Sequence, residues 1–181
     1  MILSDSELVE MLREPRTRRE GFAVLVKQYS EKLYWKVRRI VLSHEDANDV
    51  LQNVFIKVWS NLQNFQGKSS LSTWLYRIAI NESLDFLRKQ KLADKVSADE
   101  DVSVASRLMS DEYFDGDEVQ VRLQEAVARL PEVQRTVFNL KYFEEMKYSE
   151  MSQILNTSEG ALKASYHLAV KKITEYLHLF D

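Results

Sequence analysis

One predicted helix carries a set of side chains that suit nucleic acid, spaced at steps of four and seven residues: Thr73, Arg77, Asn81 and Arg88. This spacing places all of them on one face of a helix. Guanidinium groups neutralise phosphate, an amide can hydrogen-bond a base edge, and aromatic rings give unstacked bases a surface to stack on. Trp74 lies beside this face, although its position in the apolar pattern favours the core.

The preceding predicted helix, from about Glu45 to Leu62, has a second polar face. Its apolar stripe consists of Ala47, Val50, Leu51, Val54, Phe55, Val58 and Leu62. On its other side, polar groups surround an isoleucine and a tryptophan in the set Asp49, Gln52, Asn53, Ile56 and Trp59. Apolar side chains framed by polar groups suit a contact with another protein. The alternative is a solvated helix face with one exposed isoleucine.

Helices must position both faces. We expect a short helix up to Arg13 with Ser4 as its N-cap, and a helix start at Ser43. A long helix is predicted from its stripe of Phe22, Leu25, Val26, Tyr29, Leu33, Val37, Ile40 and Val41. After the polar loop Asn64–Ser70, the next helix is predicted to bury Leu71, Trp74, Leu75, Ile78, Ala79 and Phe86. Together these helices predict a bundle.

The C-terminal third has the pattern of a helix-turn-helix. One helix is predicted to bury Val119, Leu123, Ala126, Val127 and Leu130, and the next, from Pro131, to bury Val133, Val137 and Leu140. A short helix over Tyr148–Leu155 and a turn at Asn156–Ser158 then precede a longer helix. That helix is predicted to bury Leu162, Tyr166, Ala169, Ile173 and Leu177. A short helix, a tight turn and a longer helix are typical of DNA-binding helix-turn-helix motifs.

Composition favours an all-α protein of two small helical domains joined by a flexible acidic linker. The 181 residues include 4 Gly, 2 Pro and no Cys, which excludes disulfides and thiolate sites. Residues 93–118 hold 2 basic and 9 acidic residues, whereas residues 1–92 hold 15 and 11. The overall charge of -3 indicates weak duplex binding by the isolated chain. It therefore favours DNA binding within a larger assembly.

Several functional classes are not expected. The acidic N-terminus does not suit a signal peptide, and no apolar run is long enough to span a bilayer. We therefore expect a cytoplasmic protein without membrane insertion. The three histidines have no metal-ligand spacing and no phosphate-binding glycine loop is present, so we expect neither a metal site nor an enzyme.

Two long stretches of the chain resemble a known family. The strings DANDVLQNVFIKVW, QGKSSLSTWLYRIAIN and DFLRK resemble the second conserved region of bacterial sigma factors, in particular the extracytoplasmic-function (group 4) branch of the sigma-70 family. The strings PEVQRTVFNLKYFEEMKYSEMSQIL and EGALKASYHLAVKKI resemble the fourth conserved region. The resemblance covers about Phe22–Lys91 and Leu123–Leu177.

The resemblance implies a subunit that directs core RNA polymerase to promoters, without a cofactor. Residues 1–92 would form the region 2 domain, residues 93–118 the linker and residues 119–181 the region 4 domain. Core polymerase, through the clamp helices of its largest subunit, would meet Asp49, Gln52, Asn53, Ile56 and Trp59. The flap region of polymerase, promoter DNA and an anti-sigma factor are the other implied partners, and we expect a monomer.

The resemblance also assigns DNA contacts residue by residue. The minus-ten element would be captured as opened strand by Phe65, Gly67, Lys68, Ser69, Ser70, Thr73, Trp74, Arg77, Asn81 and Arg88. The minus-thirty-five element would be read by Ser158, Lys163, His167, Leu168 and Lys171. This last helix departs from the family pattern, because many relatives carry several arginines there and this chain has none. The bidentate arginine–guanine contact is therefore not available to it.

Two other functions remain open on the sequence. A free-standing helix-turn-helix regulator with an N-terminal interaction bundle would bind duplex DNA without polymerase. A helical adaptor would bind proteins alone and direct no transcription. The stretch from Glu45 to Arg88 favours the sigma factor over both.

Overall fold

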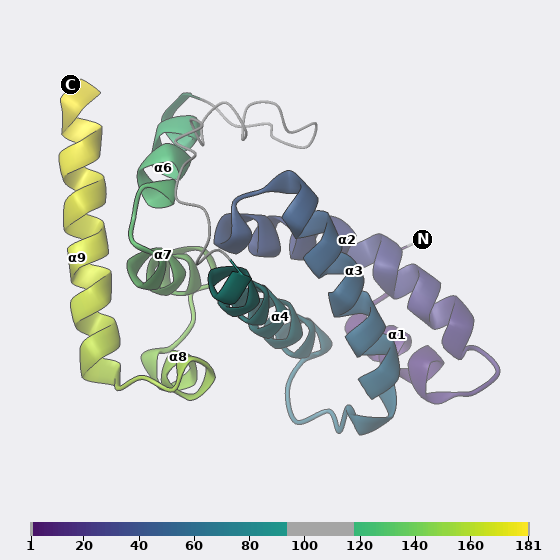
Figure 1. Ribbon diagram of the computed structural model, residues 1–181. Helices are drawn as coiled ribbons and strands as arrows, with labels where there is room; N and C mark the ends of the chain where they lie inside the picture. The colour runs from purple at the N-terminus through teal and green to yellow at the C-terminus, as the bar shows by residue number, and fades with distance from the viewer. Residues whose placement is uncertain (1, 94–117, 181) are drawn as a thin grey trace. The chain divides into compact units, whose positions relative to one another are not determined.

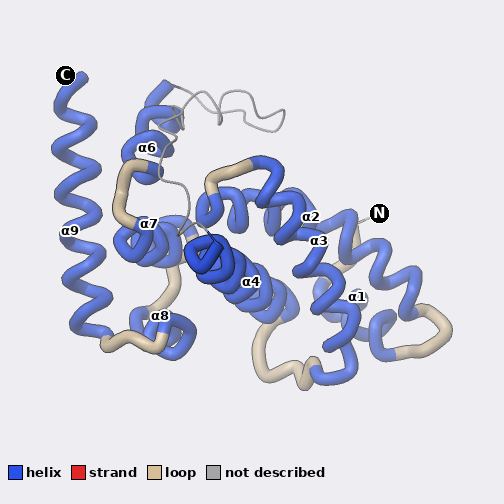
Figure 2. Tube along the Cα trace, in the orientation of Figure 1, coloured by secondary structure: helices blue, strands red, loops and turns tan. Residues whose placement is uncertain are grey.

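The computed structural model describes residues 2–93 and 118–180, and these form helices joined by short loops (Figures 1 and 2). They divide into two compact units, the first within residues 1–97 and the second within residues 98–181. The predicted linker, residues 93–118, lies almost wholly outside the described residues. No helix within the described ranges combines the length and the apolar character needed to cross a membrane.

The first unit is a bundle built around one long helix. Helix α1 spans Asp5–Arg13, α2 spans Arg18–Val41, α3 spans His44–Asn61, and α4 spans Leu71–Ala93, with a short 3-10 turn at Leu62–Asn64 after α3. Helix α2 packs against α1, α3 and α4, and α3 also packs against α4. The bundle therefore holds α3 and α4 side by side, as Figure 1 shows.

Local capping explains where the first helices begin. The hydroxyl of Ser4 accepts a hydrogen bond from the Glu7 amide, and the Glu7 carboxylate accepts one from the Ser4 amide, which is a capping box. The hydroxyl of Ser43 accepts from the Asp46 amide at the start of α3. Both predicted N-caps are confirmed. Such caps contribute about 1 kcal/mol each to helix stability.

The core of the first unit follows the predicted stripes closely in α2 and α3. The buried apolar side chains of these helices are Leu25, Tyr29, Leu33, Tyr34, Val37, Ile40, Val41, Ala47, Val50, Val54 and Val58. In α4 the buried residues are Leu71, Leu75, Ala79, Ile80, Ser83, Leu84 and Leu87. Seven residues of the predicted stripes are only half-buried and lie at the edge of the core rather than inside it: Phe22, Val26, Leu51 and Phe55 in α2 and α3, and Trp74, Ile78 and Phe86 in α4. Helix α4 contacts three helices, α1, α2 and α3.

The second unit contains the predicted helix-turn-helix. Helix α6 spans Glu118–Ala128, α7 spans Glu132–Phe138, α8 spans Tyr148–Leu155 and α9 spans Glu159–Leu177. A π-helical segment, Asn139–Phe143, continues α7, and a 3-10 turn, His178–Phe180, follows α9. Helix α9 packs against α6, α7 and α8, and its core cluster includes Phe138, Ala169 and Ile173.

Two residues that were predicted to be buried in the second unit are exposed. Val119 is 70% exposed and Val133 is 63% exposed. Each is the second residue of its helix, α6 or α7. Pro131 is the N-cap of α7 rather than its first helical residue, a difference of one position.

Candidate polymerase and nucleic-acid interfaces

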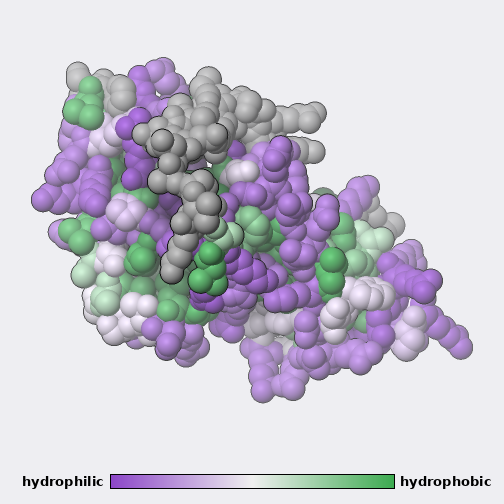
Figure 3. Space-filling model, in the orientation of Figure 1, coloured by the Kyte–Doolittle hydropathy of each residue, from purple (hydrophilic) through white to green (hydrophobic). Residues whose placement is uncertain are grey.

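The polar face of α3, defined as Asp49, Gln52, Asn53, Ile56 and Trp59, is exposed at every position. Ile56 is 63% exposed and Trp59 is 42% exposed. The Trp59 ring packs edge-on against Phe22 of α2, with ring centroids 4.9 Å apart, so part of the indole is held in place. Figure 3 shows apolar surface over α3 among hydrophilic side chains.

The loop before α4 is organised by an aromatic pair and a glycine. The rings of Phe65 and Trp74 lie with their centroids 5.1 Å apart, one at the start of the loop and one in the first turn of α4. Gly67 has a φ of +71°, a conformation that a residue with a Cβ adopts only with strain. This loop therefore has a defined shape beside a half-buried tryptophan.

Hydroxyl groups connect this loop to the start of α4. The Oγ of Ser70 accepts a hydrogen bond from the Thr73 amide at 3.1 Å and donates one to the Thr73 hydroxyl at 2.9 Å. Ser70 thus acts as a cap for α4, and Thr73 is half-buried at the helix start. These contacts fix the loop relative to the outer face of the helix.

The outer face of α4, defined as Arg77, Asn81 and Arg88, is exposed as the spacing predicts. Arg88 donates to the Asp85 carboxylate at 2.6 Å, one turn earlier in the same helix. Lys68, Gly67 and Ser70 of the loop are also exposed, and Ser69 and Phe65 are partly exposed. The structure therefore places the predicted minus-ten residues on one loop and one helix, with their polar groups accessible.

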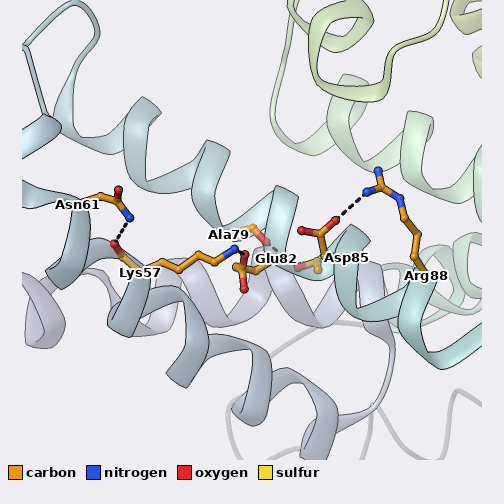
Figure 4. A network of polar contacts seen from close by, with 7 residues as sticks. Lys57, Asn61, Ala79, Glu82, Asp85 and Arg88 are labelled. Atoms are coloured by element: carbon orange, nitrogen blue, oxygen red, sulfur yellow. Dashed lines mark hydrogen bonds and ion pairs between the residues drawn. The ribbon is translucent and has the colours of Figure 1, made fainter. Parts of the chain in front are cut away.

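An ion pair joins α3 to α4 next to this face (Figure 4). The Lys57 ammonium group of α3 donates to the carboxylate of Glu82 in α4, whose side chain is only 12% exposed. This hydrogen bond raises the pKa of Lys57. The backbone carbonyl of Lys57 accepts a hydrogen bond from the side-chain amide of Asn61 at 2.8 Å. The pair fixes α4 against α3 at the residue that follows Asn81.

Sequence reasoning missed two basic groups near this site. The Arg13 guanidinium nitrogen Nη2, at the end of α1, lies 3.6 Å from the position that a Cβ on Gly67 would occupy. Lys36 of α2 has its Nζ atom 4.0 Å from the centroid of the Tyr76 ring in α4. Burial, followed by repulsion from Arg39 and Lys32, lowers the pKa of Lys36 to about 8. Neither contact has a local sequence signal, since each joins residues distant in the chain.

The helix-turn-helix presents its predicted contact residues to solvent. The turn passes through Asn156 at φ +48°, and the Ser158 hydroxyl accepts from the Ala161 amide at 3.3 Å, capping α9. The remaining predicted minus-thirty-five residues, Lys163, His167, Leu168 and Lys171, are exposed along α9. The Ser158 side chain is therefore engaged in capping, which leaves the later positions as the accessible ones.

Within the described residues, no group of three or more histidine or acidic side chains is placed to hold a metal ion. The proposed contact surfaces of the two units instead carry cationic groups, amides and partly exposed aromatic rings. Such groups bind phosphate, base edges and unstacked bases.

Comparisons with known proteins agree with this arrangement. The family described as Sigma-70 region 2 matches residues 25–93, and the family described as Sigma-70, region 4 matches residues 120–173. The chain is 32% identical over 157 residues to the ECF RNA polymerase sigma factor SigW of Bacillus subtilis, covering 82% of this chain and 84% of that protein. It is 30% identical to the RNA polymerase sigma-H factor of Pseudomonas aeruginosa, over 96% of this chain and 93% of that one.

A solved structure shares the fold. It is the sigma factor RpoE in complex with the anti-sigma factor NepR from Bartonella quintana, with a TM-score of 0.68, 21% identity, and coverage of 88% of this chain and 98% of that one. The chain belongs to the extracytoplasmic-function branch of the sigma-70 family. It is an RNA polymerase sigma factor, which directs core polymerase to promoters and initiates transcription.

The alternatives that the sequence left open are now less favoured. A free-standing helix-turn-helix regulator or a helical adaptor would not require the region 2 match over residues 25–93. The sigma factors that define the family are not enzymes in the catalytic sense.

Proposed function

We propose that the two units divide the work of promoter recognition. Residues 1–92 hold core polymerase and capture the minus-ten element, residues 93–118 connect the units, and residues 119–181 read the minus-thirty-five element. The polar face of α3 meets the clamp helices of the largest polymerase subunit, and the second unit meets the flap region. The chain itself has no catalytic role, because core polymerase carries out RNA synthesis.

The observation that supports the minus-ten assignment most strongly is the exposure of Arg77 and Asn81 on the helix that follows the Gly67 loop. A base extruded from the non-template strand would enter the loop, with Asn81 hydrogen-bonding its edge and Phe65 and Trp74 forming an apolar side. Arg77 and Arg88 would hold the strand backbone. Arg88 would exchange its exposed ion pair with Asp85 for phosphate, a small loss because exposed pairs contribute about 0–1 kcal/mol.

The energetics make capture selective. Extruding a base from a duplex costs a few kcal/mol. Stacking returns about 1–3 kcal/mol per base. The cost of extrusion and the gain from stacking are similar in size. A base that fits the loop therefore makes opening favourable, and a base that does not fit leaves the duplex closed. Melting then occurs where the sequence matches.

Regulation by a protein partner extends this proposal. The solved relative from Bartonella quintana is bound to an anti-sigma factor. We expect a comparable partner for this chain, which would cover DNA-binding or polymerase-binding surfaces until it is removed. The chain would act as a monomer in the bacterial cytoplasm, where RNA polymerase works.

Run-off transcription with purified core polymerase tests the proposal. Genomic DNA fragments serve as templates, and the 5′ ends of the transcripts are sequenced. The expected result is initiation at discrete sites that share two upstream motifs, only when the chain is present. A gel shift of the chain on the same fragments without core enzyme is the control, and we expect weak or no binding there. Absence of discrete start sites would overturn the assignment.

A further inference from the structure

The outer surface of α9 includes several of the smallest residue types in its first two turns. Gly160, Ala161 and Ala164 are all exposed, and none carries an atom beyond Cβ. A Cβ placed on Gly160 would meet nothing within 4 Å, so no other part of the described chain covers this surface. A helix of this kind can bring its backbone close to the floor of a groove.

An exposed leucine continues the same surface. Leu168 follows Ala164 by four residues and is 46% exposed. At roughly 100° per residue, Ala161, Ala164 and Leu168 lie within about 60° of one another around the helix. The three side chains therefore form one narrow apolar strip, defined here as the α9 strip.

Lys171 lies beside the α9 strip, Lys163 lies on another side of the helix, and no arginine is present between Glu159 and Leu177. Lys163 is exposed, with its Nζ atom 5.6 Å from the centroid of the Tyr148 ring, and Lys171 is exposed one turn beyond His167. Of the two acids in the helix, Glu159 lies about half a turn away from Leu168, and Glu175 is 3.9 Å from the Lys171 ammonium group. Positive charge beside an apolar strip complements a DNA groove, whose phosphates line its edges.

We infer that α9 reads thymines in the upstream promoter element through their 5-methyl groups, which contact Ala161, Ala164 and Leu168. In a helix-turn-helix the N-terminal part of this helix contacts base edges in the major groove. Each base pair there offers a distinct pattern, and the thymine methyl is the one feature that apolar side chains recognise. This inference rests on the proposed function and specifies the chemistry of its upstream contact.

Lysine supplies the remaining polar contact. Lys163, half a turn from the α9 strip, can reach a base acceptor or a phosphate, and Lys171 can reach phosphate. Such contacts position the helix, whereas the methyl contacts choose the sequence. In this inference, lysines and small apolar side chains take the place of the arginines that many relatives carry in this helix.

Replacing thymine by uracil tests this directly, because the exchange removes only the 5-methyl group. Holoenzyme, made from core polymerase and the full chain, first selects active promoters from a library randomised in the upstream element. The selected element should contain two or more thymines at fixed positions. Synthetic promoters with deoxyuridine at each such position should then bind holoenzyme about three- to fourfold more weakly per methyl group lost, the factor expected for one buried CH₂-sized group.

Variants of α9 assign the effect to the strip. Leu168→Ala should abolish the difference between thymine and uracil at one position. Val170→Ala, an equally conservative change at an exposed apolar residue on another side of α9, should retain it. Lys163→Ala should weaken binding to both templates by the same factor. Circular dichroism of each variant checks that α9 remains folded.

Two outcomes separate this inference from the proposed function. Discrete initiation with equal binding to thymine and uracil templates would overturn the methyl readout and leave the sigma-factor assignment standing. A selected element without fixed thymines would overturn it in the same way. Failure to initiate at any discrete site would overturn both.

Discussion

The ammonium group of Lys57 in α3 donates to the carboxylate of Glu82 in α4, the residue next to Asn81 (Figure 4). The pair therefore connects the helix that we propose binds polymerase with the helix that we propose binds DNA. Lys57 is largely exposed and Glu82 is not, so removal of the cation leaves a mostly covered carboxylate without this partner. Helix α3 carries the proposed polymerase contacts and α4 carries the proposed DNA contacts. The ion pair therefore helps to set the orientation of one contact face relative to the other.

Lys57→Met should lower the free energy of unfolding by about 0.5–1 kcal/mol, the range for a partly exposed ion pair. Lys57→Glu should cost more, because it places a third carboxylate near Glu82 and Asp85. The exchange Lys57→Glu with Glu82→Lys should recover part of that loss. Urea unfolding of the wild type, Lys57→Glu, Glu82→Lys and the double exchange measures the coupling energy, and a value near zero would show that the pair does not stabilise the bundle.

Gly21→Ala should destabilise the first unit, although alanine is the better helix former. A Cβ at position 21 would lie 2.8 Å from the Cβ of Met11 and 3.3 Å from its carbonyl carbon, so α1 must shift. Overpacking of this kind costs about 1–3 kcal/mol. Gly160→Ala is the matched control, since a Cβ there meets nothing. It should be neutral or stabilising by up to about 1 kcal/mol.

Lys36 should give the protein a stability that rises with pH. Its folded pKa of about 8 lies below the ordinary lysine value of 10.5, because burial and nearby cations disfavour its charge despite the contact with the Tyr76 ring. Between these two values the unfolded chain binds a proton that the folded chain has released, so the free energy of unfolding increases with pH.

The rise should amount to about 1 kcal/mol after allowance for solvent screening. It is best measured between pH 8 and 9.5, below the range in which tyrosines ionise. Lys36→Met should remove the slope, and Lys27→Met, at an exposed site of the same helix, should leave it unchanged. Equal slopes in the wild type and Lys36→Met would show that this side chain is not responsible.

Combining Gln52→Ala with Ile56→Asp should abolish holoenzyme formation. The change removes an amide and places a charge at the centre of the polar face of α3, where Ile56 is exposed and contributes little to folding. Gel filtration with core polymerase measures assembly. Ile2→Asp, at another exposed isoleucine of the first unit, should assemble normally. Co-elution of the double variant with core enzyme would exclude this face as the docking surface.

Much of the fold could be predicted because its signals are local. Ser4 and Ser43 cap helices through residues three positions away, and α8 spans Tyr148–Leu155 as its pattern indicates. Side-chain burial was predicted less well where it depends on several neighbours. Trp74 is half-buried because Phe65 covers one side of it, and Arg38, which is charged, lies inside the bundle.

In the candidate sites, too, features set by local spacing could be predicted and contacts between distant residues could not. Helical spacing alone placed Arg77, Asn81 and Arg88 on one exposed face, and the structure confirms their exposure. Helical spacing could not predict that Arg13 lies beside the Gly67 loop or that Lys36 lies over Tyr76, because each contact joins separate parts of the chain. The π-helical segment Asn139–Phe143 was also not predicted, since its residues have no local pattern that distinguishes it from an α-helix.

The most direct test of promoter opening uses 2-aminopurine, which fluoresces more strongly when it leaves the base stack, at the captured position of the minus-ten element. Fluorescence should rise when wild-type holoenzyme binds the promoter, and should rise as much with Gln63→Ala, which removes an exposed amide outside the proposed contacts. With Asn81→Ala it should stay near the level of free DNA, while gel filtration shows intact holoenzyme. An equal rise with Asn81→Ala would contradict the account.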